Sequence, residues 1–243
     1  MKTILNFGGN FLMKIGIIGA MEQEIQLLRQ AIEGAMSWER AGVLFISGTI
    51  GKHEVIVVRS GIGKVAASVT TSLLIQQYGV NMVINTGSAG GIGANLAVGD
   101  VVFSEKLAYF DVDVTGFGYE YGQLPAGMPL YFEASSYLLS AMKKAAENTG
   151  QNVKTGLIVT GDSFVNDEAK VAQIKAHFPE ALACEMEGAA IAQTARQFNI
   201  PFLVVRAISD TADHQATMSF DEFIEEAGKR SAAMVIEFAK TLV

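Results

Sequence analysis

The sequence predicts a single α/β domain built as three layers, α/β/α, with helices on both faces of a central mixed, mainly parallel sheet. Short runs of Val, Ile and Leu alternate with segments of helical periodicity from residue 14 onwards, which is typical of β/α organisation. These apolar runs are continuous, as in strands that are covered on both faces. The 243 residues, half of them hydrophobic, are enough for one large core.

The predicted elements follow one another without a linker or a repeat. Strands are predicted at residues 14–20, 43–50, 54–60, 82–87, 100–110, 156–165, 181–186 and 202–209. Helices are predicted at 22–32, 64–78, 135–150, 167–176 and 187–198, and a capping-box pattern from Ser219 to Glu222 begins a terminal helix. Residues 114–132 have no regular pattern, and a loop of this length indicates a functional or interface segment. Residues 1–12 are interpreted as an extension before a domain of residues 13–243.

Composition and charge exclude several classes of partner. The chain has 18 Lys and Arg against 25 Asp and Glu, a formal charge of −7, and no segment gathers enough basic residues to neutralise a row of phosphates. We therefore expect neither nucleic acid nor membrane as a partner. No apolar run reaches the ~20 residues of a membrane span, and polar residues interrupt the N-terminal segment before it resembles a signal peptide. The lone Cys184 permits no intramolecular disulfide, so a cytoplasmic location is expected.

Two glycine-rich segments follow predicted strands without completing a nucleotide-phosphate motif. Residues 61–66 have the G-x-G-x-x-A spacing of a dinucleotide site, but the next strand ends in Asn85 rather than in the acid that binds a ribose. A tight turn explains this segment better. Residues 85–93 lack the Lys-Ser/Thr pair of a P-loop. They are interpreted either as small residues that let a ligand approach the main chain or as a flexible turn.

Charged and hydroxyl side chains at the ends of predicted strands carry the strongest chemical signal. They are Glu24 after the first strand, Glu185 and Glu187 at an apolar strand-to-helix junction, and Arg206, Ser209 and Asp210 at the end of the last strand. In open α/β sheets, ligands bind at the carboxyl ends of strands. A single acid there could simply favour a helix N-terminus, but that explains Glu185 and Glu187 together poorly, because a buried unpaired carboxylate is destabilising. Arg206 could pair with Glu24 or Glu187.

The remaining motifs exclude two other kinds of site. The three His residues, at positions 53, 177 and 214, are scattered, and no His, Cys and carboxylate spacing indicates a metal site. No G-x-S-x-G nucleophile elbow is present. We expect no metal and no cofactor, and the set of acids at strand ends suits acid–base hydrolysis.

Seven ordered blocks resemble the 5′-methylthioadenosine/S-adenosylhomocysteine nucleosidases of the nucleoside phosphorylase superfamily. The blocks are GIIGAMEQEI (16–25), SGIGKVAA (60–67), NTGSAGG (85–91), DVTGFGYEYGQLP (113–125), TGDSFVN (160–166), EMEGAAIA (185–192) and RAISDTAD (206–213). They cover the chain from Met13 to the C-terminus. The resemblance implies a nucleoside phosphorylase-like fold, a small-molecule nucleoside substrate and a homodimer.

The resemblance also implies roles for the acids. Asp210 would protonate N7 of the leaving adenine, with Ser209 orienting its carboxyl group. Glu24 would polarise the attacking water, with Arg206 nearby, and Glu187 would bind the ribose hydroxyls. These roles agree with the chemistry, because an oxocarbenium-like transition state needs charge neutralised on the base and water held on the opposite sugar face. Asp210 must then hold a proton near neutral pH, whereas Glu24 must stay ionised.

Further residues would shape the pocket. By the same resemblance, Met186 packs on the sugar, Phe164 stacks on adenine and the backbone at Val165 reads the edge of the base. Ser88, Ala89 and Gly90 line the base and sugar pocket, and Ile62 and Phe220 contact the 5′-thio substituent. Phe117, Tyr119 and Pro125 reach across a dimer interface to close the neighbouring site.

Two other functions remain open on the sequence alone. A purine nucleoside phosphorylase would need donors for phosphate, whereas the first strand-to-helix turn reads Gly-Ala-Met-Glu-Gln-Glu and is acidic. A non-catalytic adenosine-binding protein on the same fold would not need all three acids, Glu24, Glu187 and Asp210. The order of preference among 5′-substituted adenosines depends on packing, which the sequence does not define.

Overall fold

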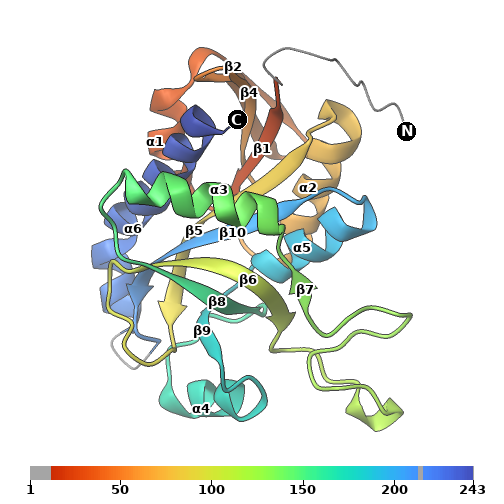
Figure 1. The fold of residues 1–243 in the computed structure, drawn as a ribbon. Helices are drawn as coiled ribbons and strands as arrows, with labels where there is room; N and C mark the ends of the chain where they lie inside the picture. Colours follow the sequence, from red (N-terminus) through yellow and green to blue (C-terminus); the bar gives the residue numbers. More distant parts are fainter. Residues whose placement is uncertain (1–11, 213–215, 243) are drawn as a thin grey trace.

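The computed structural model describes residues 12–212 and 216–242, apart from the side chains of residues 217–219. Most of the predicted N-terminal extension, residues 1–11, lies outside this description, as do His214 and the side chain of Ser219. Figure 1 shows one body in which helices pack on two faces of a sheet, with a long loop that stands away from it. No helix in the described part of the chain is long and apolar enough to cross a membrane.

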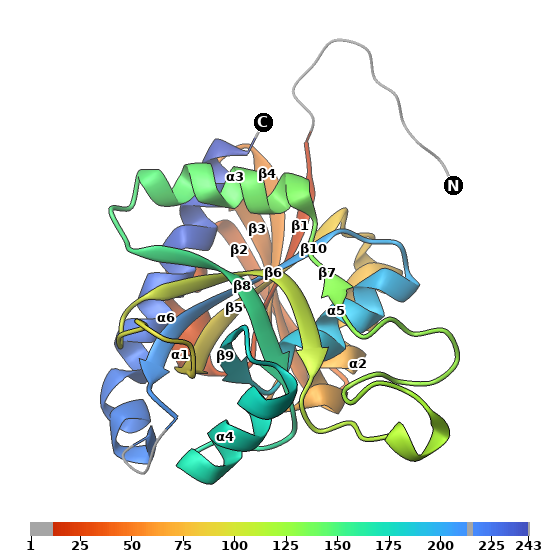
Figure 2. The same cartoon turned by 60° about the horizontal axis from the view of Figure 1, so that its bottom comes forward.

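The described strands form one mixed sheet, in the order β10-β6-β8-β9-β5-β1-β4-β3-β2. Its strands are β1 (Lys14–Gly19), β2 (Glu33–Arg40), β3 (Val43–Ile50), β4 (His53–Arg59), β5 (Met82–Gly91), β6 (Val101–Tyr109), β7 (Phe132–Glu133, paired with β6), β8 (Val153–Thr160), β9 (Ala181–Glu185) and β10 (Phe202–Asp210). An additional pairing of β10 with β5 closes the strands β5, β10, β6, β8 and β9 into a ring, and these strands lie around the centre of Figure 2.

Helices cover both faces of the sheet. They are α1 (Glu22–Ala31), α2 (Lys64–Tyr78), α3 (Ser136–Glu147), α4 (Glu168–His177), α5 (Gly188–Gln197) and α6 (Ala216–Thr241). On one face α1, α3 and α6 bury side chains such as Leu28, Met142 and Phe238 in a single core cluster. On the other face α2 and α5 bury Leu74 and Ile191 in a second one. The predicted three-layer arrangement is confirmed.

Several predicted details differ from the structure. Five pairings between described strands are parallel and five antiparallel, so the sheet is mixed. The sequence analysis missed β2: among the described strands it pairs with β3, and it is exposed along most of its length, so it lacks the apolar signal of a buried strand. The terminal helix begins at Ala216 rather than at Ser219. Strand β5 continues to Gly91, so most of the glycine-rich segment 85–93 is a strand rather than a flexible turn.

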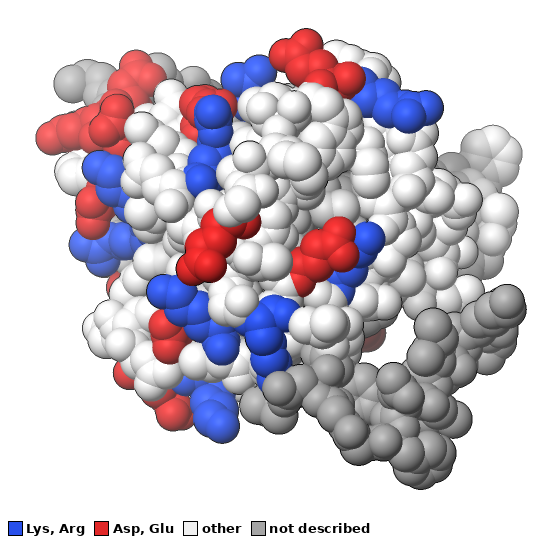
Figure 3. Space-filling model, turned by 90° about the horizontal axis from the view of Figure 1, so that it is seen from above, with Lys and Arg blue, Asp and Glu red and all other residues white. Residues whose placement is uncertain are grey.

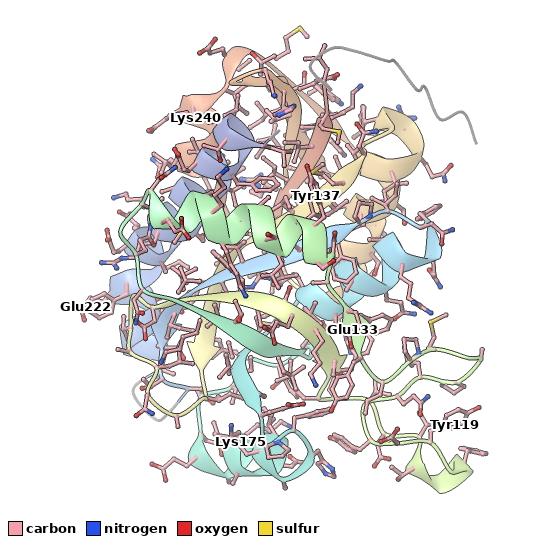
Figure 4. All side chains as sticks on the ribbon, in the orientation of Figure 1. Tyr119, Glu133, Tyr137, Lys175, Glu222 and Lys240 are labelled. Atoms are coloured by element: carbon pink, nitrogen blue, oxygen red, sulfur yellow. The ribbon has the colours of Figure 1, made fainter. Side chains whose placement is uncertain are left out.

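The predicted irregular loop is an arm of residues 112–131. It contains one short 3-10 helix, η1 (Thr115–Phe117), and turns. Its base is closed by the Gly122 N–H, which donates to the Val112 carbonyl at 2.8 Å, and by the Tyr121 hydroxyl, which donates to the Phe110 carbonyl at 2.8 Å. The arm extends from the body at the lower right of Figure 4, where Tyr119 is labelled.

Charged side chains of both signs are interspersed on the face seen from above in Figure 3. An exposed ion pair of this surface type joins Arg230 Nε to Glu226 Oε1 at 3.0 Å on α6. Exposed ion pairs contribute little to stability. The stability of the fold therefore rests mainly on its buried apolar clusters.

Candidate active site

A cavity of about 390 Å³ lies where several strands end. Its walls come from the segments that follow β1, β4, β8 and β9, from the carboxyl ends of β5, β9 and β10, and from α6, as predicted for a ligand at strand carboxyl ends. The lining residues that the sequence analysis had singled out are Glu24, Ile62, Ser88, Ala89, Gly90, Phe164, Met186, Glu187, Ser209, Asp210 and Phe220. Ala20, Met21, Cys184 and Glu185 complete the wall. Its size is within the range of small-molecule sites.

Glu24 is held in the cavity wall by hydrogen-bond donors from two strands. It is the third residue of α1, and its Oε2 accepts the N–H of Ala20 at 2.7 Å and of Met21 at 3.0 Å, which caps the helix. Its Oε1 accepts the N–H of Ser88 at 2.9 Å and the Ser88 hydroxyl at 3.2 Å. Four donors around a carboxylate that is 3% exposed stabilise its negative charge.

Glycine at position 87 is required for this arrangement. A Cβ atom there would lie 2.6 Å from Glu24 Oε1 and 3.0 Å from Arg206 Nη1, closer than heavy atoms pack. The absence of a side chain therefore lets the carboxylate and the guanidinium approach the same stretch of β5. Arg206 nevertheless forms no ion pair with Glu24 among the described residues.

The partner of Arg206 is Glu185, which the sequence analysis had noted without assigning it a role. Arg206 Nη2 lies 2.5 Å from Glu185 Oε2 and 3.7 Å from Glu187 Oε2. It also donates to Asn85 Oδ1 at 2.5 Å. The other donors to Glu185 are the Thr160 hydroxyl and the N–H groups of Glu187 and Gly188, at 3.0 and 2.7 Å. The guanidinium is 1% exposed and lies behind the cavity wall rather than in it.

Glu187 lies beside this pair and has fewer donors. Its Oε1 accepts the N–H of Gly63 at 2.9 Å. Its pKa is raised to about 8, by burial first and then by the neighbouring Glu185 and Glu24 carboxylates, which together outweigh the lowering by Arg206 and the Gly63 N–H. Burial by itself lowers the pKa of Arg206, but the three carboxylates outweigh it and the net shift is upward. Arg206 is therefore a permanent cation, and Glu187 is the carboxyl group whose charge responds to pH.

The acid at the end of β10 is positioned by a bulge. The register with β5 shifts between Ile208 and Asp210, and such bulges re-aim side chains. Asp210 Oδ2 accepts the Ser209 hydroxyl at 2.9 Å, and Oδ1 accepts the Ala212 N–H at 2.9 Å. The Ser209 hydroxyl is also 3.4 Å from the Ala89 carbonyl. The predicted pairing of Ser209 with Asp210 is thus present, and both side chains are about 99% buried, at 1% exposure each.

Apolar side chains form the rim of the cavity. The rings of Phe164 and Phe220 meet edge to face, with centroids 5.7 Å apart, a favoured aromatic geometry. Phe164 and Ile62 remain 42% and 56% exposed. Val165 lies outside the main cavity and lines a smaller one of about 30 Å³ beside it.

The structure does not bring three predicted site residues to this cavity. Phe117, Tyr119 and Pro125 lie on the arm, and Phe117 is 84% exposed. None of them lines the cavity of its own chain among the described residues.

Cys184, His53 and His177 belong to the surroundings rather than to the chemistry. Burial, followed by the charges of Asp210 and Glu185, raises the pKa of the Cys184 thiol, so the thiol stays protonated. His53 contacts the Leu242 carbonyl and His177 stacks on Tyr121. Within residues 12–212 and 216–242, no group of three or more His, Cys, Asp or Glu side chains is placed to hold a metal ion.

Comparisons with known proteins agree with this geometry. The family model described as "Phosphorylase superfamily" matches residues 14–240. The 5′-methylthioadenosine/S-adenosylhomocysteine nucleosidase of an Exiguobacterium species is 52% identical over 95% of this chain and 99% of its own length. That of Haemophilus influenzae is 48% identical over 95% of this chain and its whole length.

Solved structures give the same relationship. The S-adenosylhomocysteine nucleosidase of Streptococcus pyogenes, in complex with 5-methylthiotubericidin, superposes with a TM-score of 0.93 at 47% identity, over 97% of this chain and all of that one. The Neisseria meningitidis 5′-methylthioadenosine/S-adenosylhomocysteine nucleosidase, in complex with methylthio-immucillin-A, has a TM-score of 0.93 at 47% identity, over 95% of this chain and all of that one. The chain therefore belongs to the phosphorylase superfamily and, within it, to the family of 5′-methylthioadenosine/S-adenosylhomocysteine nucleosidases.

Proposed function

We propose that this protein hydrolyses the N-glycosidic bond of 5′-methylthioadenosine and S-adenosylhomocysteine, releasing adenine and the 5′-thio-substituted ribose. The observation that carries the proposal is one cavity in which two of the four buried carboxyl groups, those of Glu24 and Asp210, have different surroundings. Glu24 accepts main-chain N–H groups on both of its oxygens, whereas Asp210 accepts the hydroxyl of the adjacent Ser209 on Oδ2 and the Ala212 N–H on Oδ1. Two carboxyl groups in unlike environments are the usual equipment of glycoside hydrolysis.

On the leaving-group side, Asp210 donates a proton to N7 of adenine. As the C–N bond breaks, electrons move onto the base, and protonation prevents an anion from building up there. Ser209 keeps the carboxyl group in place, because its hydroxyl lies within reach of both Asp210 and the Ala89 carbonyl. Phe164 stacks on the base, the backbone at Val165 reads its edge, and Ala89 and Gly90 lie along it.

On the opposite face of the sugar, Glu24 holds the water and accepts its proton. Its four donors hold the carboxylate in place, and a negative charge there stabilises the positive charge that develops on the ribose. Arg206 contributes from behind the wall, because it partly neutralises Glu185 and Glu187. Ser88 supports Glu24 through its N–H and its hydroxyl.

The remaining contacts hold the sugar. Glu187 accepts hydrogen bonds from the ribose hydroxyls, and Met186 packs on the ribose ring. Ile62 and Phe220, both on the rim, contact the 5′-thio substituent. Binding energy from these groups orients the glycosidic bond between Asp210 and Glu24.

A phosphorylase reaction fits the site less well. Phosphate would need cationic or main-chain donors, but the described lining contains no Lys or Arg. The nearest guanidinium, Arg206, is committed to Glu185 and Asn85. The main-chain donors of Ala20, Met21 and Ser88 are occupied by Glu24.

The test is product analysis in phosphate-free buffer. We expect adenine and the free 5′-thio-ribose, at a rate that added phosphate leaves unchanged. Formation of a ribose 1-phosphate derivative would support the phosphorylase reading. Calorimetric titration with intact substrate that shows lasting binding and no product would support an adenosine-binding protein.

We also propose that the protein acts as a homodimer in which Phe117, Tyr119 and Pro125 close the cavity of the partner. The support is the arm itself: it stands away from its own body, and it presents Phe117 to solvent in a single chain. An exposed aromatic side chain on a protruding loop is typical of a binding surface.

A further inference from the structure

The first turn of α2 is capped by side chains from distant segments. The N-cap residue is Gly63, which has no side chain to accept a hydrogen bond. Instead, Glu187 Oε1 accepts the Gly63 N–H at 2.9 Å, and Asp162 Oδ1 accepts the Lys64 N–H at 2.8 Å. These two carboxylates satisfy the N–H groups of the N-cap residue and of the first helical residue, which have no partner within the helix.

Glycine is needed at position 63 for these two carboxylates to reach the start of α2. Its φ of +96° disfavours any residue with a Cβ atom, and a Cβ there would lie 3.0 Å from Asp162 Oδ1. The missing side chain lets Asp162 approach the helix end. Because Asp162 accepts the N–H of Lys64, the residue next to Gly63, the location of the Gly63 N–H depends on where Asp162 lies.

Asp162 is held in turn by an ionic cluster of three segments. Lys64 Nζ lies 2.6 Å from Asp111 Oδ2 and 3.8 Å from Asp162 Oδ2. Asp111 Oδ2 also accepts the Asp162 N–H at 2.9 Å. Asp111 follows β6, Asp162 follows β8 and Lys64 begins α2, so the cluster connects three loops around the cavity. The lysine and Asp111 side chains are only about a quarter exposed, at 24% and 23%.

We propose that Lys64, Asp111 and Asp162 are positioning residues for ribose binding, which hold the first turn of α2 so that the Gly63 N–H stays bonded to Glu187. None of the three lines the cavity, so they act through Gly63 and not on the substrate. This inference rests on the proposed function, in which Glu187 accepts the ribose hydroxyls.

The bond from Gly63 affects the charge of Glu187. The charged groups that face Glu187 are Glu185 from β9, Glu24 from α1 and Arg206 from β10, together with the α2 N-terminus. Burial and the two carboxylates raise the pKa of Glu187, and the Gly63 N–H opposes them. Loss of that N–H removes a donor to the anion, so the pKa rises further and less carboxylate is present at pH 7.

The sharpest variant is Asp162→Ala, which removes the acceptor for the Lys64 N–H. Loss of one hydrogen bond to the Glu187 carboxylate corresponds to a rise of about one unit in its pKa. We expect KM at pH 7 to rise roughly ten-fold, kcat to change little, and the acidic limb of kcat/KM to move to higher pH. Asp162→Asn keeps an acceptor oxygen and should restore most of the loss. Lys64→Met removes the charge but not the backbone N–H and should be intermediate.

Lys106→Met is the matched control. Lys106 forms an equally short pair with Glu180, at 2.6 Å, with a side-chain exposure of 25%. Its Nζ also lies over an aromatic ring, that of Tyr131, as Lys64 lies over that of Tyr109. It is on β6, away from the cavity lining, so KM and the pH profile should remain those of the wild type.

Melting temperature against pH provides a readout that needs no substrate. Stability falls as pH rises until Glu187 ionises in the folded protein. In Asp162→Ala, the upper end of that pH range should move upward, and Glu187→Gln in the same background should abolish the shift. An unmoved pH range together with an unmoved kinetic limb would overturn the inference, even if the variant melts earlier. Wild type that is inactive on both nucleosides would instead overturn the proposed function, and the melting data would still decide the positioning role. Should Asp162→Ala fail to fold, Lys64→Met carries the same comparison.

Discussion

The floor and the rim of the cavity differ in what holds them. The floor contains Glu24, Glu187 and Asp210, which are 3%, 7% and 1% exposed and bonded to backbone N–H groups. The rim contains Ile62 and Phe164, which are 56% and 42% exposed and lie on loops. Groups held by the main chain are already in place before a ligand arrives, whereas exposed apolar side chains become buried only when something covers them. This difference indicates that the floor provides the catalytic groups and the rim provides binding contacts. Variants of the floor should therefore change kcat, and variants of the rim should change KM.

The largest expected effect is the loss of kcat in the floor variants Glu24→Gln and Asp210→Asn. Each removes a proton-transfer group, and we expect a decrease of ~10²–10⁴-fold. A substrate with a better leaving group than adenine should rescue Asp210→Asn more than Glu24→Gln, because only Asp210 acts on the base. Equal rescue would mean that the acid and the base have been assigned wrongly. Steady-state kinetics with both substrates make this comparison.

Glu24→Gln should also lower stability. Both carboxylate oxygens of Glu24 accept backbone N–H groups, so an amide must place its NH₂ against one of these donors. We expect a loss of about 1–3 kcal/mol in the free energy of unfolding, measured with urea. The substitution is therefore expected to destabilise the fold, although Gln and Glu have the same size. An unfolding free energy equal to that of the wild type would show that the donors do not hold the carboxylate.

Glu187→Gln should change how stability depends on pH. The pKa of Glu187 is raised from an ordinary value of 4.5 to about 8 by burial and by the neighbouring carboxylates. Between these values the folded protein keeps a proton that the unfolded chain has lost, so stability falls as pH rises, by at most about 1.4 kcal/mol per pH unit. The Gln variant lacks this decline and should melt later than the wild type at pH 8, with a smaller difference at pH 5.

The matched control for that measurement is Glu222→Gln. Glu222 is exposed on α6 and points into solvent at the left of Figure 4. Its melting curve should follow that of the wild type at both pH values. The same dependence on pH in wild type and Glu187→Gln would remove Glu187 as the titrating group.

At the rim, Phe164→Ala should raise KM and leave kcat nearly unchanged. Stacking of an aromatic side chain on a base is worth ~1–3 kcal/mol, which corresponds to about a 5- to 150-fold rise in KM. Phe223→Ala is a suitable control, because Phe223 is 36% exposed on α6 and does not line the cavity. A fall in kcat comparable to that of the floor variants would abolish the distinction between floor and rim.

The smallest effect should come from Phe117→Ala on the arm. If this side chain closes the partner's cavity, we expect KM to rise by less than about ten-fold, because residues at the edge of an interface contribute little each. Wild type should be a dimer at assay concentration, and its activity should fall on dilution as the dimer dissociates. A fully active monomer, observed by light scattering beside the assay, would contradict this role.

The sequence by itself determined the order of the elements and the residues of the cavity. Periodicity is a local property, so helices such as 64–78 were predicted to the residue. Carboxylates in apolar segments are similarly conspicuous, because their burial requires partners. That argument led to Glu185 and Glu187, the carboxyl ends of strands pointed to Glu24 and Asp210, and the family resemblance supplied their expected roles. All four residues line the cavity. The exposed strand β2 gave no such signal and was missed.

Only the tertiary structure determined which strands pair and which side chains form hydrogen bonds and ion pairs with each other. The closure of β5, β10, β6, β8 and β9 into a ring depends on strand register, and the bulge before Asp210 adjusts that register locally. Glu185, rather than Glu24 or Glu187, proved to be the closest partner of Arg206. Gly63 and Glu187 are 124 positions apart in the chain, and Ser88 and Glu24 are 64 apart. No local pattern encodes such pairs, because a hydrogen bond requires its two atoms within about 3 Å, and only the packed fold brings them that close.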